Sequence, residues 1–188
     1  CMNSINQMIL EKKDKKASKY LTKLSKLIRL ILEHVDEPDV SLKDELTMLE
    51  TYILLESLRF NGEIKYKLDI GSDIDMENTY LPTMVLQPFV ENAIWHGLMP
   101  KKKEGTGLIT ISIRQEEGKL KCLIEDNGIG REKSLELQQK SVFKRKSLWV
   151  KITEQRLKLI SKEVRQQLVQ IKDLRDALGQ ALGTRVEV

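Results

Sequence analysis

Cysteine, aromatic residues and long apolar runs are all scarce in this chain of 188 residues. Its two cysteines, Cys1 and Cys122, are too few for a disulfide framework and lack metal-ligand spacing, which favours a reducing, cytoplasmic setting. No apolar run reaches the ~18 residues that a membrane-spanning helix needs. The chain also opens without the basic flank and apolar block of a secretory signal peptide.

An excess of charge of one sign is absent as well. The 32 Lys and Arg residues nearly balance 28 Asp and Glu residues, and the formal net charge of +4 does not point to nucleic acid as a partner. Hydrophobic residues make up 40% of the chain, which is enough for a buried core and excludes wholesale disorder. The length fits one large domain, or one domain with an appendage.

Residues 1–35 are predicted to form one helix. Apolar residues between Ala17 and Val35 recur at spacings of three and four, which places them in a single stripe. Pro38 ends this helix, because proline disfavours helical geometry at the residue before it.

A second helix is predicted from Leu42 to about Phe60. The segment from Ser41 to Asp44 has the form of an N-cap box, in which the serine side chain accepts a hydrogen bond from a backbone amide of the first turn. Two apolar-striped helices joined by a short turn form either an antiparallel hairpin or a dimerising stem.

After residue 61 apolar and polar residues begin to alternate, as they do in strands. Strands and helices are mixed and several strands are joined by hairpins, so the predicted fold class is an α+β sandwich. The expected elements are strands over residues 64–70, 108–113, 120–125, 168–173 and 184–188, helices over 82–98 and 147–161, and a polar, turn-rich segment over 131–146.

The segment from Leu86 to Gly97 places Glu91, Asn92 and His96 on or beside one helix. Asn92 and His96 are four residues apart, so α-helical geometry would put them on one face. The oxygen of a neutral asparagine is a suitable hard ligand for Mg²⁺, which binds nucleotide phosphates with few protein ligands.

A second segment, Asp-Asn-Gly-Ile-Gly from Asp126 to Gly130, directly follows a predicted strand. A carboxylate at this position can accept a hydrogen bond from an exocyclic amine, and the two glycines allow the backbone to approach a flat ring. Each segment alone is a weak signal, whereas their order and their separation of about 35 residues make the pair specific.

Together the two segments resemble the N box and the first glycine box of the GHKL ATP-binding fold, which histidine kinases, gyrase and related ATPases share. The first is closest to the LytS-like sensor histidine kinases, in which this helix reads roughly L-P-x-x-x-L-Q-P-x-V-E-N-A-x-x-H-G. The resemblance extends over essentially the whole chain, because residues 42–46, 49–60, 151–157 and 183–186 also look like this family. It implies a partial helical dimerisation stem over residues 1–60 and a GHKL catalytic domain, a two-layer α/β sandwich, over residues 61–188.

The resemblance also implies a role for each candidate residue. Asp126 would read the adenine amino group, and Asn92 would hold Mg²⁺ against the phosphates of ATP. Glu91 and His96 would complete the catalytic site beside Asn92. The positions implied for ATP binding are Asn92, His96, Asp126, Gly128, Gly130, Lys151 and Thr184.

Two positions depart from the family pattern. Trp149 stands where the second glycine box carries a glycine, which puts a close backbone approach to phosphate in doubt at that point. Pro88 falls where gyrase-type ATPases carry the catalytic glutamate, and this disfavours stand-alone ATP hydrolysis.

The phosphoacceptor histidine of the family lies in a P-H-F-x-F-N segment. Residues 1–6 resemble the stretch that comes directly after that segment in the family, so we expect a fragment that lacks the acceptor and does not phosphorylate itself. His34 is interpreted as a surface histidine near a helix C-terminus, where the helix dipole favours it.

The predicted function is therefore the ATP-binding kinase domain of a two-component sensor histidine kinase, with ATP and Mg²⁺ as cofactors. It would transfer the γ-phosphoryl group to a histidine and onward to a response regulator. The family implies a homodimer through the N-terminal helices and a place on the cytoplasmic side of a membrane. The alternative is a degenerate, non-catalytic module of the same fold that binds nucleotide or a protein partner.

Overall fold

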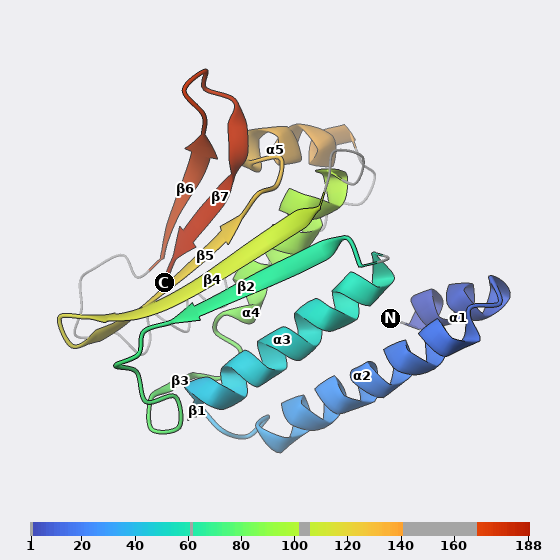
Figure 1. Ribbon diagram of the computed structural model, residues 1–188, viewed down its shortest axis with the longest axis horizontal. Helices are drawn as coiled ribbons and strands as arrows, with labels where there is room; N and C mark the ends of the chain where they lie inside the picture. Colours follow the sequence, from blue (N-terminus) through green and yellow to red (C-terminus); the bar gives the residue numbers. More distant parts are fainter. Residues whose placement is uncertain (1, 61, 102–105, 141–168) are drawn as a thin grey trace. The chain divides into compact units, whose positions relative to one another are not determined.

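The computed structural model describes residues 2–60, 62–101, 106–140 and 169–188 (Figure 1). The chain divides into two compact units, of which the first comprises Cys1–Ile64 with Asp75–Met84 and the second comprises Lys65–Ile74 with Val85–Val188. None of the helices described has the length and the apolar character needed to cross a membrane.

The first unit begins with two helices where the sequence predicted one. Helix α1 (Met2–Leu10) and helix α2 (Asp14–Glu33) are separated by Lys12, whose φ of 55° is left-handed. The amide of Lys13 donates to the carbonyl of Met8, and the amide of Lys12 donates to that of Ile9, as in a Schellman motif. Neither glycine nor proline occurs at this break, because its left-handed residue is a lysine, so the sequence carried no turn signal there.

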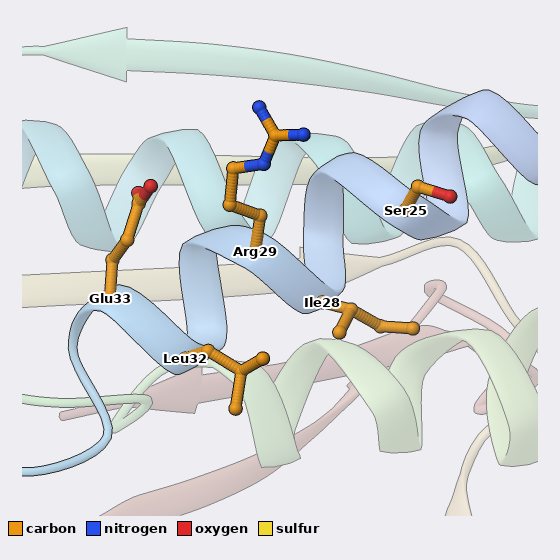
Figure 2. A pocket seen from close by; sticks show the side chains of 5 residues that line it. All are labelled: Ser25, Ile28, Arg29, Leu32 and Glu33. Atoms are coloured by element: carbon orange, nitrogen blue, oxygen red, sulfur yellow. The ribbon is translucent and has the colours of Figure 1, made fainter.

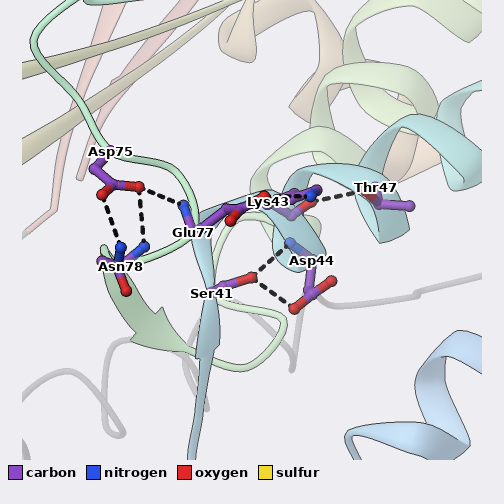
Figure 3. Close-up of polar contacts among 7 residues, drawn as sticks. All are labelled: Ser41, Lys43, Asp44, Thr47, Asp75, Glu77 and Asn78. Carbon is purple, nitrogen blue, oxygen red and sulfur yellow. Dashed lines mark hydrogen bonds and ion pairs between the residues drawn. The ribbon is translucent and has the colours of Figure 1, made fainter.

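The predicted N-cap of the next helix is confirmed. Helix α3 (Leu42–Arg59) begins at Ser41, whose Oγ accepts from the Asp44 amide at 3.1 Å and donates to Asp44 Oδ2 at 2.6 Å (Figure 3). The N-terminal turn of α3 also contacts a loop of the same unit, where Lys43 Nζ lies 2.6 Å from Glu77 Oε1. Helices α2 and α3 pack side by side and run in opposite directions (Figure 1), as in the predicted hairpin.

A two-stranded antiparallel ladder completes the first unit. Strand β1 (Asp39–Ser41) pairs with strand β3 (Tyr80–Pro82), so Pro82 ends a strand and does not begin a helix as predicted. Helical structure starts only after Met84, which has a φ of 58° and donates its amide to the buried Glu45 carboxylate at 2.7 Å. The left-handed residue separates strand from helix.

The second unit is built on a five-stranded sheet with the order β2-β4-β5-β7-β6. The predicted strand over residues 64–70 and the predicted central hairpin are confirmed. Glu117 and Gly118 join the hairpin with φ values of 51° and 74°, as a type I′ turn requires. The strands are β2 (Ile64–Ile70), β4 (Gly107–Glu116), β5 (Lys119–Asp126), β6 (Gln170–Arg175) and β7 (Ala181–Glu187).

A short helical run packs on this sheet. It comprises α4 (Gln87–Asn92), the π-helix η1 (Ala93–Leu98) and the 3₁₀ turn η2 (Met99–Lys101). Segment η1 contacts β4, β5 and β7. The alternating isoleucines of the predicted strands are buried, as expected for a sheet covered by helices; they are Ile109, Ile111, Ile113 and Ile124.

The predicted turn-rich segment over residues 131–146 is wrong for its first ten residues, which form helix α5 (Arg131–Lys140). Most residues of this helix are polar, so no apolar stripe in the sequence indicates a helix there. Ion pairs to the neighbouring strand stabilise its first turn: Arg131 Nε lies 3.0 Å from Asp173 Oδ1, and Arg175 pairs with Glu132 at 2.8 Å. The predicted helix over residues 147–161, with Trp149 and Lys151, lies outside the described residues.

Candidate nucleotide site

Asp126 is the last residue of β5, and its side chain is only 7% exposed. The amide of Gly128 donates to its Oδ1 at 2.8 Å, and the backbone of Thr184, its partner on β7, also donates to the carboxylate. Burial raises the pKa of Asp126 to about 6, although these two hydrogen bonds and the charge of Lys101 act in the opposite direction. A buried carboxylate with a pKa near neutrality is typical of a functional site.

Glycines surround this carboxylate and leave no room for side chains. A Cβ atom at Gly97 would lie 2.6 Å from Asp126 Oδ1, and one at Gly128 would overlap the backbone of Gly97. Gly183 has a φ of 140°, and a Cβ atom there would overlap the Asp126 carbonyl. The ends of η1, β5 and β7 therefore meet at backbone contact around one acidic side chain.

Gly97 and Gly183 were not among the predicted site residues. Gly97 ends the matched Leu86–Gly97 segment, and Gly183 precedes Thr184 in another matched segment, so the sequence contained a signal for both. The structure adds the reason: the carbonyl of Gly97 accepts the Ile129 amide at 3.1 Å, which joins the two predicted segments directly.

Glu91 and Asn92 are the last two residues of α4, and both are half-buried. Gln87 Nε2 donates to Glu91 Oε1 at 3.1 Å, which fixes the glutamate along its own helix. His96 lies one turn later in η1, where partial burial lowers its pKa and favours the neutral imidazole. Asn92 ends α4 and His96 lies four residues later in the π-helix η1, so their shared helical face stays a prediction.

The structure thus gathers some of the predicted residues more closely than others. Asp126, Gly128 and Thr184 form one hydrogen-bonded group, and Gly130 borders it through Ala181, since a Cβ atom on Gly130 would lie 2.9 Å from that of Ala181. Glu91, Asn92 and His96 lie on the helical run that leads to Gly97. Among the described residues, no group of three or more His, Cys, Asp or Glu side chains is arranged to hold a metal ion. A magnesium ion held by an asparagine and phosphate oxygens is compatible with that finding.

The chain is similar in sequence to known sensor histidine kinases. A family model described as histidine kinase matches residues 1–64. The sensor histidine kinase YpdA of Escherichia coli is 32% identical over 129 residues, covering 69% of this chain and 22% of YpdA. The sensor protein LytS of Bacillus subtilis is 33% identical over 115 residues, covering 61% of this chain and 19% of LytS. These matches place the chain in the histidine kinase family. It spans about a fifth of the length of these two curated relatives.

The solved structures agree with this family at the level of the fold. The histidine kinase domain of the blue-light activated kinase from Erythrobacter litoralis superposes with a TM-score of 0.53 at 14% identity, over 95% of this chain and 80% of that chain. The predicted α+β fold of GHKL type is confirmed, and the predicted family is confirmed at the level of histidine kinases.

Proposed function

We propose that this histidine kinase chain binds ATP with Mg²⁺ and supplies the γ-phosphoryl group for a phosphohistidine and then for a response-regulator aspartate. We further propose that it belongs to a LytS-like, membrane-anchored sensor kinase and acts on the cytoplasmic side of the membrane. The observation that carries the proposal is the buried carboxylate of Asp126, enclosed by Gly97, Gly128 and Gly183.

Adenine recognition follows from the chemistry of that carboxylate. An ionised Asp126 only accepts hydrogen bonds, so it pairs with the exocyclic amine of adenine and not with the carbonyl that guanine presents at the equivalent position. Its pKa of about 6 means that the carboxylate is ionised at pH 7 and above. The lack of side chains at Gly128 and Gly130 would allow the backbone to approach the flat ring closely.

The phosphates and the metal are assigned to the helical run. The Asn92 amide oxygen suits Mg²⁺, and the half-buried Glu91 and His96 lie beside it in sequence. When bound, Mg²⁺ would neutralise charge on the β- and γ-phosphates. The backbone of Gly128 and Gly130 and the side chain of Thr184 are proposed to line the rest of the site, with Lys151 outside the described residues.

Neither described histidine is assigned the role of phosphoacceptor. His34 Nδ1 lies 3.0 Å from Glu37 Oε2 at the C-terminal end of α2, which is a local helix-end contact. His96 lies in η1, within the proposed nucleotide site. A phosphoacceptor must be presented to the γ-phosphate, so we propose that the acceptor histidine belongs to the longer kinase and not to these residues.

Homodimerisation is proposed through α2. The apolar stripe that the sequence predicted is divided in the structure: Ala17, Tyr20 and Leu27 are buried inside the first unit, whereas a second set remains exposed. The exposed set consists of Leu21, Ile28 and Leu32 on α2 and Val35 just after it. Ile28 and Leu32 line a groove of about 480 Å³ with Ser25, Arg29 and Glu33 (Figure 2), and exposed apolar patches mark interaction sites.

Calorimetry on an Asn92→Ala variant tests the assignment of metal and phosphates. We expect adenosine to bind the variant as it binds the parent, because the base contacts Asp126, while the Mg²⁺-dependent part of ATP affinity falls. The matched control is Asn78→Ala, which removes an amide from the Asp75 turn of the first unit. An equal loss for adenosine and for ATP with Mg²⁺ would refute the metal role of Asn92.

A further inference from the structure

Asn127 follows the adenine-reading aspartate, yet its side chain is engaged within the protein. Its Oδ1 accepts the Leu108 amide at 2.8 Å, and its Nδ2 donates to the Thr106 carbonyl at 3.2 Å. Its own amide donates to the Leu108 carbonyl at 3.2 Å. Asn127 therefore fastens the loop after β5 to the start of β4, and this loop positions the Asp126 carboxylate.

The fourth polar contact of Asn127 comes from a different element. Lys101, the last residue of η2, donates from Nζ to the Asn127 carbonyl at 2.6 Å. With the hydrogen bond from the Ile129 amide to Gly97, this makes a second connection between the helical run and the loop that follows Asp126. The Lys101 ammonium is thereby held at the backbone carbonyl of Asn127, the residue that follows Asp126.

The other charged groups around Asp126 have other partners. Arg131 of α5 is bound to Asp173 of β6, and Arg185 of β7 is bound to Glu125. Asp173 raises the pKa of Asp126, and Lys101 lowers it. His96 of η1 favours its neutral form, because partial burial lowers its pKa. Among the residues that the structure describes, the charge of Lys101 therefore opposes the cost of ionising Asp126 in its buried position.

We propose that Lys101 is a positioning residue for adenine recognition, which holds the loop after Asp126 through the Asn127 carbonyl and maintains the negative charge of the aspartate. This inference rests on the proposed function, since it concerns the same nucleotide site. It assigns Lys101 to the adenine end of the site, whereas a basic residue near a nucleotide would ordinarily be assigned to the phosphates.

The test measures adenosine and ATP affinity by calorimetry between pH 6 and pH 8.5, with Lys101→Met and Lys101→Arg variants of the chain. Adenosine has no phosphate, so an effect on its affinity cannot come from a lost contact to phosphate. For Lys101→Met we expect adenosine affinity to fall about twofold at pH 7 and about fivefold at pH 6, because a rise of one in the pKa of Asp126, from about 6 to about 7, lowers its ionised fraction by these factors. The loss should shrink toward pH 8.5, where Asp126 ionises without help, and Lys101→Arg should restore most of the affinity.

The matched control is Lys121→Met, which removes a lysine from β5 whose partners are Glu116 and Glu187. It should leave adenosine affinity and its pH dependence unchanged. A Lys101→Met variant that weakens ATP but leaves adenosine unchanged at every pH would overturn the proposal, because Lys101 would then act on the phosphates.

A second readout is independent of ligand affinity. The pKa of the Asp126 carboxyl, followed by carbon NMR in the nucleotide-free chain, should rise in Lys101→Met and return in Lys101→Arg. An unchanged pKa in Lys101→Met would also overturn the inference. If the parent binds neither adenosine nor ATP, the proposed function fails, while the NMR titration still decides the role of Lys101.

Discussion

The buried position of Asp126 should cost the nucleotide-free protein stability at neutral pH, and this cost can be measured. Burial raises the pKa of the carboxyl from its usual value of 3.8 to about 6. The folded chain therefore holds a proton between about pH 4 and pH 6 that the unfolded chain has released. By linkage, this contribution to stability is fully present below pH 4 and is lost as the pH rises through 6.

The magnitude follows from the difference between the two pKa values, which is about two. A difference of one between the folded and the unfolded pKa corresponds to about 1.36 kcal/mol, so ionising Asp126 in the folded chain costs about 3 kcal/mol. The side chain is only 7% exposed, so solvent screening reduces this figure little. A cost of this size at one residue is typical of a functional site, where ligand binding uses the charge.

The assay is urea unfolding of the nucleotide-free chain between pH 4 and pH 7.5, comparing the parent with Asp126→Asn. Asparagine keeps an oxygen that can accept the Gly128 amide and has no charge to bury. The parent should therefore lose about 2–2.5 kcal/mol relative to the variant between pH 4 and pH 7.5, because the unfolded carboxyl, with a pKa of 3.8, is already partly ionised at pH 4. The control, Asp69→Asn, changes a half-exposed aspartate that pairs with Arg114 and should not reproduce this pattern. A parent that gains stability relative to Asp126→Asn over the same range would refute the reasoning.

Two further predictions concern packing and assembly. Gly97→Ala should weaken ATP binding at least tenfold and lower the free energy of unfolding by about 1–3 kcal/mol, because its Cβ would lie 2.6 Å from Asp126 Oδ1. Calorimetry and thermal unfolding check this; Gly118→Asn, in the distant hairpin turn, should leave ATP affinity unchanged, and undiminished ATP binding by Gly97→Ala would contradict the glycine contact. Leu32→Glu should convert a dimer to a monomer in sedimentation experiments, since Leu32 is 64% exposed on α2. The control Leu178→Glu, at a residue that is 84% exposed in the β6–β7 turn, should leave the dimer intact. A dimer that survives Leu32→Glu would exclude this face of α2 as the interface.

Features specified by neighbouring residues were predictable from the sequence. The N-cap at Ser41 is set by the hydroxyl and the amide three residues later, and the β4–β5 hairpin is set by alternation around Gly118. The strand over residues 64–70 likewise follows from local alternation. Such elements form because side-chain period and turn chemistry favour the same structure.

Features set by contacts between distant residues were not predictable in this way. The break between α1 and α2 lies at Lys12, which has a left-handed backbone although it is not a glycine. The first turn of α5 forms ion pairs with Asp173 and Arg175, some forty residues away in the sequence. In the candidate site, the sequence identified Asp126, Gly128 and Thr184 as separate motif members. It contained nothing that would predict the π-helix η1 or the contact of Lys101 with Asn127, because both arise from the way the helical run meets the sheet.

The most direct test of the central claim is nucleotide affinity measured by calorimetry at pH 7.5 with Mg²⁺, for ATP and GTP, on the parent and on Asp126→Asn. We expect the parent to prefer ATP. We also expect Asp126→Asn to lose about 1.5–3 kcal/mol of ATP binding, the value of a hydrogen bond to a charged group, while Asp69→Asn loses none. An Asp126→Asn variant that binds ATP as tightly as the parent would contradict the role of Asp126, because the adenine would then be bound elsewhere.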